Sequence, residues 1–236
     1  MKALLISDVH ANIYALEAIW NVESDSEVVY CAGDLVDYGP FPSEVIGWMR
    51  EHRAICVQGN HDKDVVDAYR KPESFGSLPA NQMQWKHCNA SQLGEDDVLF
   101  LEALPGSVAF EMDRIGYSLQ HMYSGYDTIA SLPQFTQFWR RQTEGNVRDA
   151  SCRRLIFGHT HRRCVHLLSD RDLWMNSGSV SYRRTDDPSK EAHYITITDG
   201  RIELKNVDYD RSPLLRAVKA LSLSEPEMAV AFRFFG

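Results

Sequence analysis

The sequence predicts an α/β fold in which two mixed β-sheets pack together and helices flank them on the outside. Two observations predict this class. In the first part of the chain, short apolar runs alternate with amphipathic helical patterns, which is typical of strand–helix–strand crossover units. Beyond Gly106, a succession of short strand patterns takes their place. The chain has 236 residues, of which 44% are hydrophobic, and this is enough apolar material for a core.

The first part of the chain contains predicted strands separated by helices. The strands are expected at residues 4–6, 28–31 and 54–57, which are short apolar runs. Asn12 is suited to cap an amphipathic helix that turns Leu16 and Ile19 inward. A turn at residues 39–42 leads into a second helical pattern at residues 43–50. This order implies largely parallel pairing of the first strands.

The rest of the chain is expected to contain helices, then a meander of strands, then two terminal helices. Residues 64–104 look helical, with breaks at Gly94 and Pro105. Strands are expected at residues 108–112, 115–120, 154–157, 164–168, 173–175, 193–198 and 202–207. The pair Asp199-Gly200 signals a tight hairpin between the last two. We expect residues 1–236 to form a single domain with a C-terminal helical tail from about residue 212, made of helices at 213–221 and 225–235.

The composition narrows the class of protein. The formal net charge of −8 makes a duplex-DNA binder with a basic face an unfavourable interpretation, so nucleic acid is an unlikely partner. We expect no membrane partner, because no apolar stretch is long enough to span a bilayer or to act as a signal peptide. The five cysteines are scattered and odd in number, which favours a reducing, cytoplasmic location.

Five short segments combine carboxylate, imidazole and amide side chains, and four of them directly follow a predicted strand. They are Asp8-Val9-His10, Gly33-Asp34-Leu35-Val36-Asp37, Gly59-Asn60-His61-Asp62, Gln120-His121 and Gly158-His159-Thr160-His161. In an open α/β sheet, ligands bind at the carboxyl ends of the strands, so these segments are expected to converge on one crevice. We expect Gly33, Gly59 and Gly158 to permit the sharp turns that aim a side chain inward.

These segments predict a site for two metal ions. Their candidate ligands are Asp8, His10, Asp34, Asn60, His121, His159 and His161. Oxygen and nitrogen ligands without a thiolate suit Mn, Fe, Ni, Co or Zn. One metal ion cannot use so many protein ligands and keep an open position, whereas two ions that share one carboxylate can. Such a pair, about 3.5–4 Å apart, generates a bridging hydroxide and holds a phosphoryl group. Each segment alone is weak evidence, and the prediction depends on the ordered set of five.

The ordered set resembles the motif blocks of the calcineurin-like metallophosphoesterase superfamily, which are D-x-H, G-D-x-x-D, G-N-H-D/E, H and G-H-x-H. Residues 34–40 and 176–180 are further similar to the small bacterial and archaeal YfcE-like phosphodiesterases. The resemblance runs from Lys2 to about Asp210 and implies a dinuclear phosphoesterase in which Mn is the favoured metal. The chain departs from the family pattern at Ala11, where many members have glycine, and around His121, where close relatives often have a His-Gly pair.

The resemblance also implies a role for each matching residue. The first metal would be held by Asp8, His10 and His161, and the second by Asn60, His121 and His159. Asp34 would bridge the two metals. His61 would stabilise charge at the phosphate or protonate the leaving oxygen, and Asp37 would orient His61 through a hydrogen bond. Histidine is the usual proton donor near neutral pH, which agrees with the role of His61.

The sequence therefore predicts an enzyme that hydrolyses a small phosphodiester, phosphomonoester or nucleotide pyrophosphate. One alternative is a catalytically silent scaffold that binds a protein partner, but such a scaffold is expected to lose ligands, whereas this chain keeps the full set. The other alternative is a nuclease with the same dimetal core, which the acidic charge disfavours. Arg183 and Arg184 either contact a substrate phosphate or form solvated pairs with Asp186 and Asp187.

Overall fold

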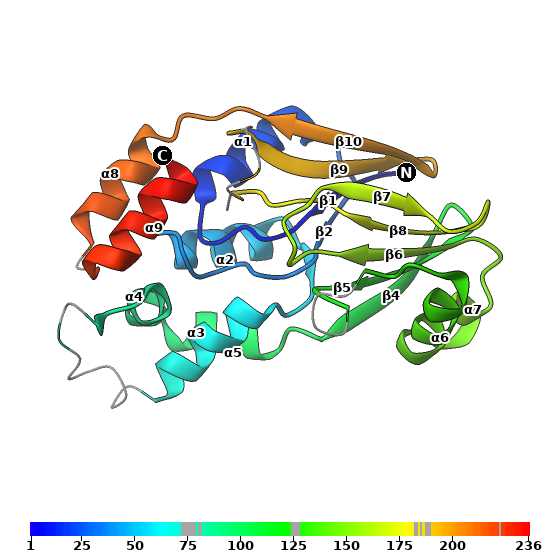
Figure 1. Cartoon of the computed structure of the whole chain (residues 1–236), viewed down its shortest axis with the longest axis horizontal. Coiled ribbons are helices and arrows are strands. Elements are labelled where there is room, and N and C mark those ends of the chain that lie inside the picture. The colour runs from blue at the N-terminus through cyan, green and yellow to red at the C-terminus, as the bar shows by residue number, and fades with distance from the viewer. Residues whose placement is uncertain are drawn as a thin grey trace.

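The computed structural model consists of two five-stranded β-sheets packed between helices (Figure 1). It describes residues 1–71, 79, 82–123, 128–181, 184, 186, 190–221 and 223–236, without the side chains of Asn146 and Phe234. The first sheet contains, in spatial order, β10 (Arg201–Val207), β9 (Ala192–Thr198), β1 (Lys2–Ile6), β2 (Val28–Cys31) and β3 (Ile55–Cys56). The second contains β4 (Ser107–Met112), β5 (Ile115–Gln120), β6 (Arg153–Phe157), β8 (Asp172–Asn176) and β7 (Cys164–Leu167). The predicted fold class is confirmed.

β1 lies at the centre of the first sheet and is buried on both faces. It pairs in parallel with β2, which pairs in parallel with β3, and it pairs antiparallel with β9. Because successive side chains of a strand point to opposite faces, Leu4 packs toward the helices and Leu5 toward the second sheet. The crossovers are α1 (Ile13–Glu23) and α2 (Pro42–Glu51), as expected from the sequence. The side chain of Asn12 caps α1 by accepting a hydrogen bond from the backbone N–H of Ala15 at 3.2 Å.

The second sheet differs from the meander that the sequence predicts. β5 and β6 are parallel, and so are β6 and β8. The chain returns between β5 and β6 through α6 (Leu132–Gln142) and α7 (Gly145–Arg148), for which the sequence analysis predicts no helix. Phe135, Phe138 and Trp139 of α6 pack on the outer face of this sheet, against Leu155 and Trp174 among others. The predicted meander overlooks local signals of this helix. Ser131 caps it by accepting from the backbone N–H of Gln134, and Pro133 lies in its first turn. The buried aromatic residues recur at helical spacing.

The remaining helices follow the predicted order. They are α3 (Asn60–Arg70), α4 (Trp85–Gln92), α5 (Glu95–Glu102), α8 (Ser212–Ala220) and α9 (Glu225–Phe235). The predicted break at Gly94 separates α4 from α5, and Asp199 and Gly200 turn β9 into β10 with positive φ values of 49° and 79°. In the described part of the chain, we find no helix with the length and hydrophobicity that a bilayer crossing requires.

Candidate metal centre

The five segments meet at one edge of the two packed sheets, because each follows the carboxyl end of a strand. The loops after β1, β2 and β3 carry segments 8–10, 33–37 and 59–62, and those after β5 and β6 carry His121 and segment 158–161. The strands within each set run parallel, so their carboxyl ends point the same way. The predicted convergence is therefore observed, with all five segments rather than four directly after strands.

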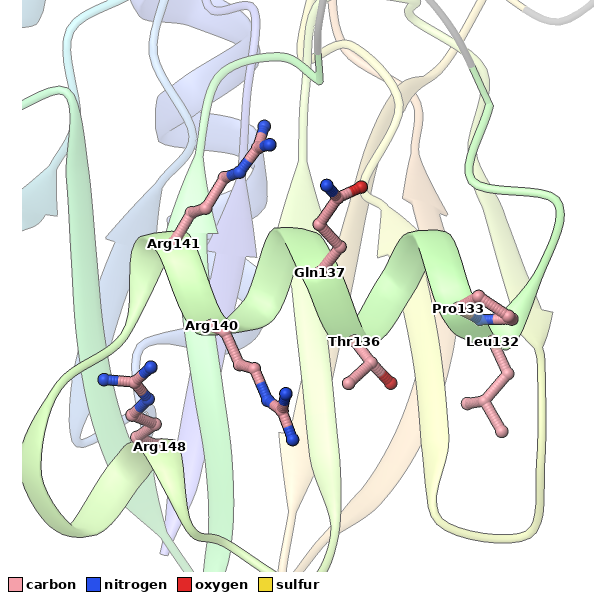
Figure 2. Close-up of a pocket in the computed structure, with 7 residues that line it drawn as sticks. All are labelled: Leu132, Pro133, Thr136, Gln137, Arg140, Arg141 and Arg148. Atoms are coloured by element: carbon pink, nitrogen blue, oxygen red, sulfur yellow. The ribbon is translucent and has the colours of Figure 1, made fainter.

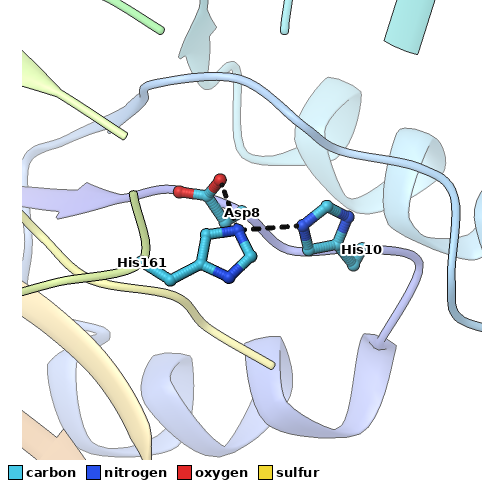
Figure 3. A group of neighbouring side chains, drawn as sticks. All are labelled: Asp8, His10 and His161. Atoms are coloured by element: carbon cyan, nitrogen blue, oxygen red, sulfur yellow. Dashed lines mark hydrogen bonds and ion pairs between the residues drawn. The ribbon is translucent and has the colours of Figure 1, made fainter. Parts of the chain in front are cut away.

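The first group of candidate ligands is Asp8, His10 and His161 (Figure 3). Nε2 of His161 lies 3.1 Å from a carboxylate oxygen of Asp8 and 3.4 Å from Nε2 of His10. Asp8 and His10 are fully buried. Nδ1 of His10 lies 3.3 Å from the carbonyl oxygen of Val36. Because a carbonyl oxygen can only accept a hydrogen bond, Nδ1 carries the proton, and Nε2 faces His161.

The second group is Asp34, His121 and His159, with Asn60 beside it. Nε2 of His121 lies 3.1 Å from Oδ2 of Asp34, 3.2 Å from Nδ1 of His159 and 3.0 Å from Oδ1 of Asn60. Nδ1 of His121 donates to the carbonyl oxygen of Ala32 at 2.7 Å. This bond fixes the ring and its tautomer, as carbonyl groups commonly do for metal-binding histidines.

The geometry of both groups fits divalent cations. Nitrogen and oxygen ligands roughly 2.1 Å from a common ion lie roughly 3.0–3.4 Å apart at ordinary coordination angles. The ligand atoms of the two groups have these separations, although ring nitrogens that face each other this closely cannot all be satisfied as hydrogen bonds. Oδ2 of Asp34 is buried, and its contact among the described residues is the ion pair with Nε2 of His121 at 3.1 Å. A cation would satisfy this oxygen and the facing imidazole lone pairs.

The charges of the ligands show how the site is balanced without metal ions. Burial raises the pKa of Asp34, but the neighbouring His121 outweighs burial and lowers it, so the carboxylate stays ionised. Burial lowers the pKa of His121. The charge and the hydrogen bond of Asp34 outweigh the effect of burial and raise the pKa of His121 to about 9. Burial lowers the pKa of His10 well below its usual value, so this ring is neutral. A cation at Asp34 would therefore displace the proton of His121.

His61 lies beside the two groups, on the first turn of α3. Its Nδ1 donates to Oδ2 of Asp37 at 2.7 Å, and its backbone N–H donates to Oδ1 of Asp34 at 2.9 Å. Its ring centroid is 5.2 Å from that of His10. Burial lowers the pKa of His61, but the hydrogen bond to Asp37 and the charges of nearby aspartates raise it to about 9. The predicted contact between Asp37 and His61 is thus present, and it leaves Nε2 of His61 available for a second partner.

The comparison with known proteins identifies the family. The sequence profile for calcineurin-like phosphoesterases matches residues 1–163, a range that contains all five segments. The chain belongs to the calcineurin-like phosphoesterase family.

Individual relatives agree with this assignment. An uncharacterized protein of Methanocaldococcus jannaschii is 26% identical over 226 residues, which cover 87% of both chains. The structure of a metallophosphoesterase from Sphaerobacter thermophilus has a TM-score of 0.73 at 22% identity and covers 99% of both chains. YfcE, a phosphoesterase of E. coli, has a TM-score of 0.52 at 18% identity and covers 89% of this chain and all of its own. The similarity to the Sphaerobacter thermophilus structure therefore extends through the terminal helices.

The site of this calcineurin-like phosphoesterase has an unusual backbone. Positive φ values between 48° and 74° occur at six candidate site residues, which are Asp8, His10, Asp34, Asp37, His159 and His161. Aspartate and histidine tolerate this left-handed region better than most residues, and strained conformations cluster at functional sites. Ala11 also has a φ of 50°, a conformation that glycine adopts without steric cost.

The three glycines of the segments have two different functions. Gly33 has a φ of 91°, as the predicted turn requires. Gly59 is extended, with φ −93° and ψ 172°, and Gly158 has no positive φ, so a left-handed conformation does not explain the need for glycine at either position. They are needed for close approach instead. A Cβ on Gly59 would lie 2.1 Å from Oδ1 of Asp34, and a Cβ on Gly158 would lie 1.9 Å from Oγ of Ser7.

Asp62 supports the site as a capping residue, although the family resemblance assigns it no role. It is fully buried, and its carboxylate accepts hydrogen bonds from four backbone N–H groups. The donors are Asp34 (3.1 Å), Leu35 (2.7 Å), Val36 (3.2 Å) and Gly59 (2.9 Å). The signal in the sequence was its place as the third residue of α3, where an acidic side chain often caps the helix. Asp62 thereby ties the loop that carries Asp34 to the loop that carries Asn60.

The two arginines proposed for substrate binding are placed only in part. Arg183 lies outside the described residues. Nε of Arg184 donates to Oδ1 of Asp186 at 2.8 Å, which is the solvated pair considered above. A second guanidinium nitrogen donates to the carbonyl oxygen of Thr160 at 3.1 Å, between His159 and His161. Arg184 therefore contacts the ligand loop, and its contact with a substrate phosphate stays a prediction.

An open groove of about 680 Å³ lies over α6 and α7 (Figure 2). Arg140, Arg141 and Arg148 extend from these helices along it, and none of the described residues that line it is a candidate ligand. A smaller hollow adjoins the metal centre and is lined by His159, Thr160 and Trp174 among others. We place the functional site at the ligand groups, because their chemistry and not cavity volume defines it.

The close approach at Gly158 generates a prediction. Gly158→Ala should lower the content of bound divalent metal, because the new methyl group collides with Ser7 and lies 2.8 Å from Oδ2 of Asp8. Gly106→Ala is the matched control, since nothing lies within 4 Å of a Cβ there. Elemental analysis of both purified variants checks this. A Gly158→Ala protein with the metal content of the control would contradict the account.

Proposed function

We propose that this protein is a dinuclear metal-dependent phosphoesterase, with Mn as the favoured metal. One observation carries the proposal. Two groups of three side chains, each with its ligand atoms within 4.8 Å of one another, meet at one edge of the packed sheets of a calcineurin-like phosphoesterase. Asp8, His10 and His161 would hold one ion. Asn60, His121 and His159 would hold the other, and Asp34 would contact both.

The cations would supply an activated water and neutralise the phosphoryl charge. The residues of the chain supply the rest. Six of the seven ligands are carboxylates or imidazoles that the fold aims inward, and Asn60 adds a neutral amide that avoids excess negative charge. Asp37 accepts a hydrogen bond from Nδ1 of His61. The proton on Nε2 is therefore the one available to the oxygen of the leaving group.

The substrate class that this site supports is a small phosphodiester, phosphomonoester or nucleotide pyrophosphate. The net charge of −8 disfavours long polyanions such as nucleic acids, which require many cationic contacts. YfcE, which shares the fold, is a phosphoesterase, and this supports the reaction class. The complete ligand set favours an enzyme over a silent scaffold.

Metal removal tests the proposed function directly. Stripping divalent cations with a chelator should abolish hydrolysis, because the ligand set needs cations to activate water, and added Mn, Ni or Co should restore it. The assay should use a panel of phosphate esters and dinucleoside polyphosphates. Unchanged turnover by fully stripped protein would rule out the dinuclear mechanism.

The role of His61 gives a second prediction. His61→Ala should keep its metals and lose activity, by about 10²–10⁴-fold for an alkyl ester, because general acid catalysis typically contributes this much. A nitrophenyl ester should lose far less, since nitrophenolate departs without protonation. Metal content and kcat for both esters should be measured. Equal losses, or missing metal, would remove His61 from the acid role.

A further inference from the structure

The loop that carries Asp37 has a conformation that its own residues do not favour. Asp37 and Tyr38 are consecutive and have φ values of 74° and 61°. Such values persist only where the surrounding structure fixes them. Oδ1 of Asp37 accepts from the backbone N–H of Tyr38 at 2.9 Å, and Oδ2 accepts from His61. The direction of the His61 ring therefore depends on what holds this loop.

Asn89 of α4 holds the loop at both ends of the strained pair. Its side chain is fully buried. Oδ1 accepts from the backbone N–H of Asp37 at 2.9 Å, and Nδ2 donates to the carbonyl oxygen of Gly39 at 2.9 Å. α4 also packs along α3, the helix that begins with Asn60 and His61. One short helix thus contacts Asp37 directly and packs against the helix that carries His61.

The terminal hairpin α8–α9 in turn holds α4. Trp85, the first residue of α4, is buried in an apolar cluster with Leu214 and Val218 of α8 and Ala231 and Phe235 of α9. Its indole N–H donates to the carbonyl oxygen of Glu227 at 3.2 Å.

The site loop also touches the hairpin directly, because Tyr38 packs against the same cluster. The ring of Tyr38 lies 4.9 Å from that of His61 and 5.2 Å from that of His10, measured between centroids. The hairpin is at the end of the molecule where α4 lies (Figure 1). It lies beyond residue 163, where the family match ends.

We propose that Asn89 is a positioning residue for the Asp37–His61 pair and that the terminal hairpin holds it in place through Trp85. This inference rests on the proposed function, because it assigns the support of the proposed proton donor. It gives the C-terminal tail a function in catalysis that no motif of its own indicates. A purely structural Asn89 would instead contribute to stability and affect all substrates alike.

The experiment compares Asn89→Leu, which keeps the branched shape of the side chain without the two hydrogen bonds, with Gln92→Ala. Gln92 is an exposed amide on the same helix, so its variant controls for changes to α4. For each, kcat is measured with an alkyl and a nitrophenyl phosphodiester in the presence of Mn, together with metal content. Asn89→Leu is also combined with His61→Ala. Trp85→Phe, which removes only the indole N–H and part of the volume, tests the hairpin and serves if Asn89→Leu does not fold.

We expect Asn89→Leu to keep its metals and to lower kcat by about 10–100-fold for the alkyl ester, a part of what the acid contributes. The nitrophenyl ester should change by less than about threefold, and the variant should lose nothing further in the His61→Ala background. Trp85→Phe should show the same preference with a smaller loss, and Gln92→Ala should match wild type.

Equal losses on both esters, lost metal, or full additivity with His61→Ala would overturn the positioning role. A Trp85→Phe variant with the wild-type kcat on both esters would overturn the proposed role of the hairpin. If wild-type protein hydrolyses the esters with Mn while Asn89→Leu is unchanged, only this inference fails. A wild type that hydrolyses none of the esters of the panel contradicts the proposed function, and the inference falls with it.

Discussion

Two fully buried aspartates, Asp8 and Asp34, set the constraint on which this structure depends. Removing an ionised carboxylate from water costs several kcal/mol unless an opposite charge or hydrogen bonds compensate it. Backbone N–H groups and imidazoles offset part of this cost. Among the described residues, Oδ2 of Asp34 has the ion pair with His121, although a carboxylate oxygen can accept more than one contact. Divalent cations are the charge that this arrangement of oxygen and nitrogen atoms accommodates.

The fold meets this constraint at the ends of parallel strands. Each strand ends in a turn that aims one or two ligands toward the others, and most of these residues adopt left-handed backbone conformations. Asp62 ties two of the loops together with four hydrogen bonds. Gly59 and Gly158 leave room for the carboxylates that approach them. The strain is therefore distributed over several short loops that the packed sheets hold in place.

The sequence was sufficient to predict the strands, the two packed sheets and the side chains that converge, because polar ligands directly after apolar runs are a local pattern. The prediction missed α6, although the N-cap Ser131, Pro133 in the first turn and aromatic residues at helical spacing are local signals of a helix. The sequence also could not show why glycine is required at positions 59 and 158, because the side chains that approach them are distant in sequence. Asn89 lies in no motif, and its contacts with Asp37 and Gly39 exist only in the folded protein.

The two ligand groups are proposed to hold two cations that share Asp34. Anomalous scattering at the Mn edge from crystals grown with Mn locates such cations without any assay of activity. We expect two anomalous peaks about 3.5–4 Å apart. One should be contacted by Asp8, His10 and His161, the other by Asn60, His121 and His159, and both by Asp34. A single peak, or Mn bound away from these residues, would contradict it.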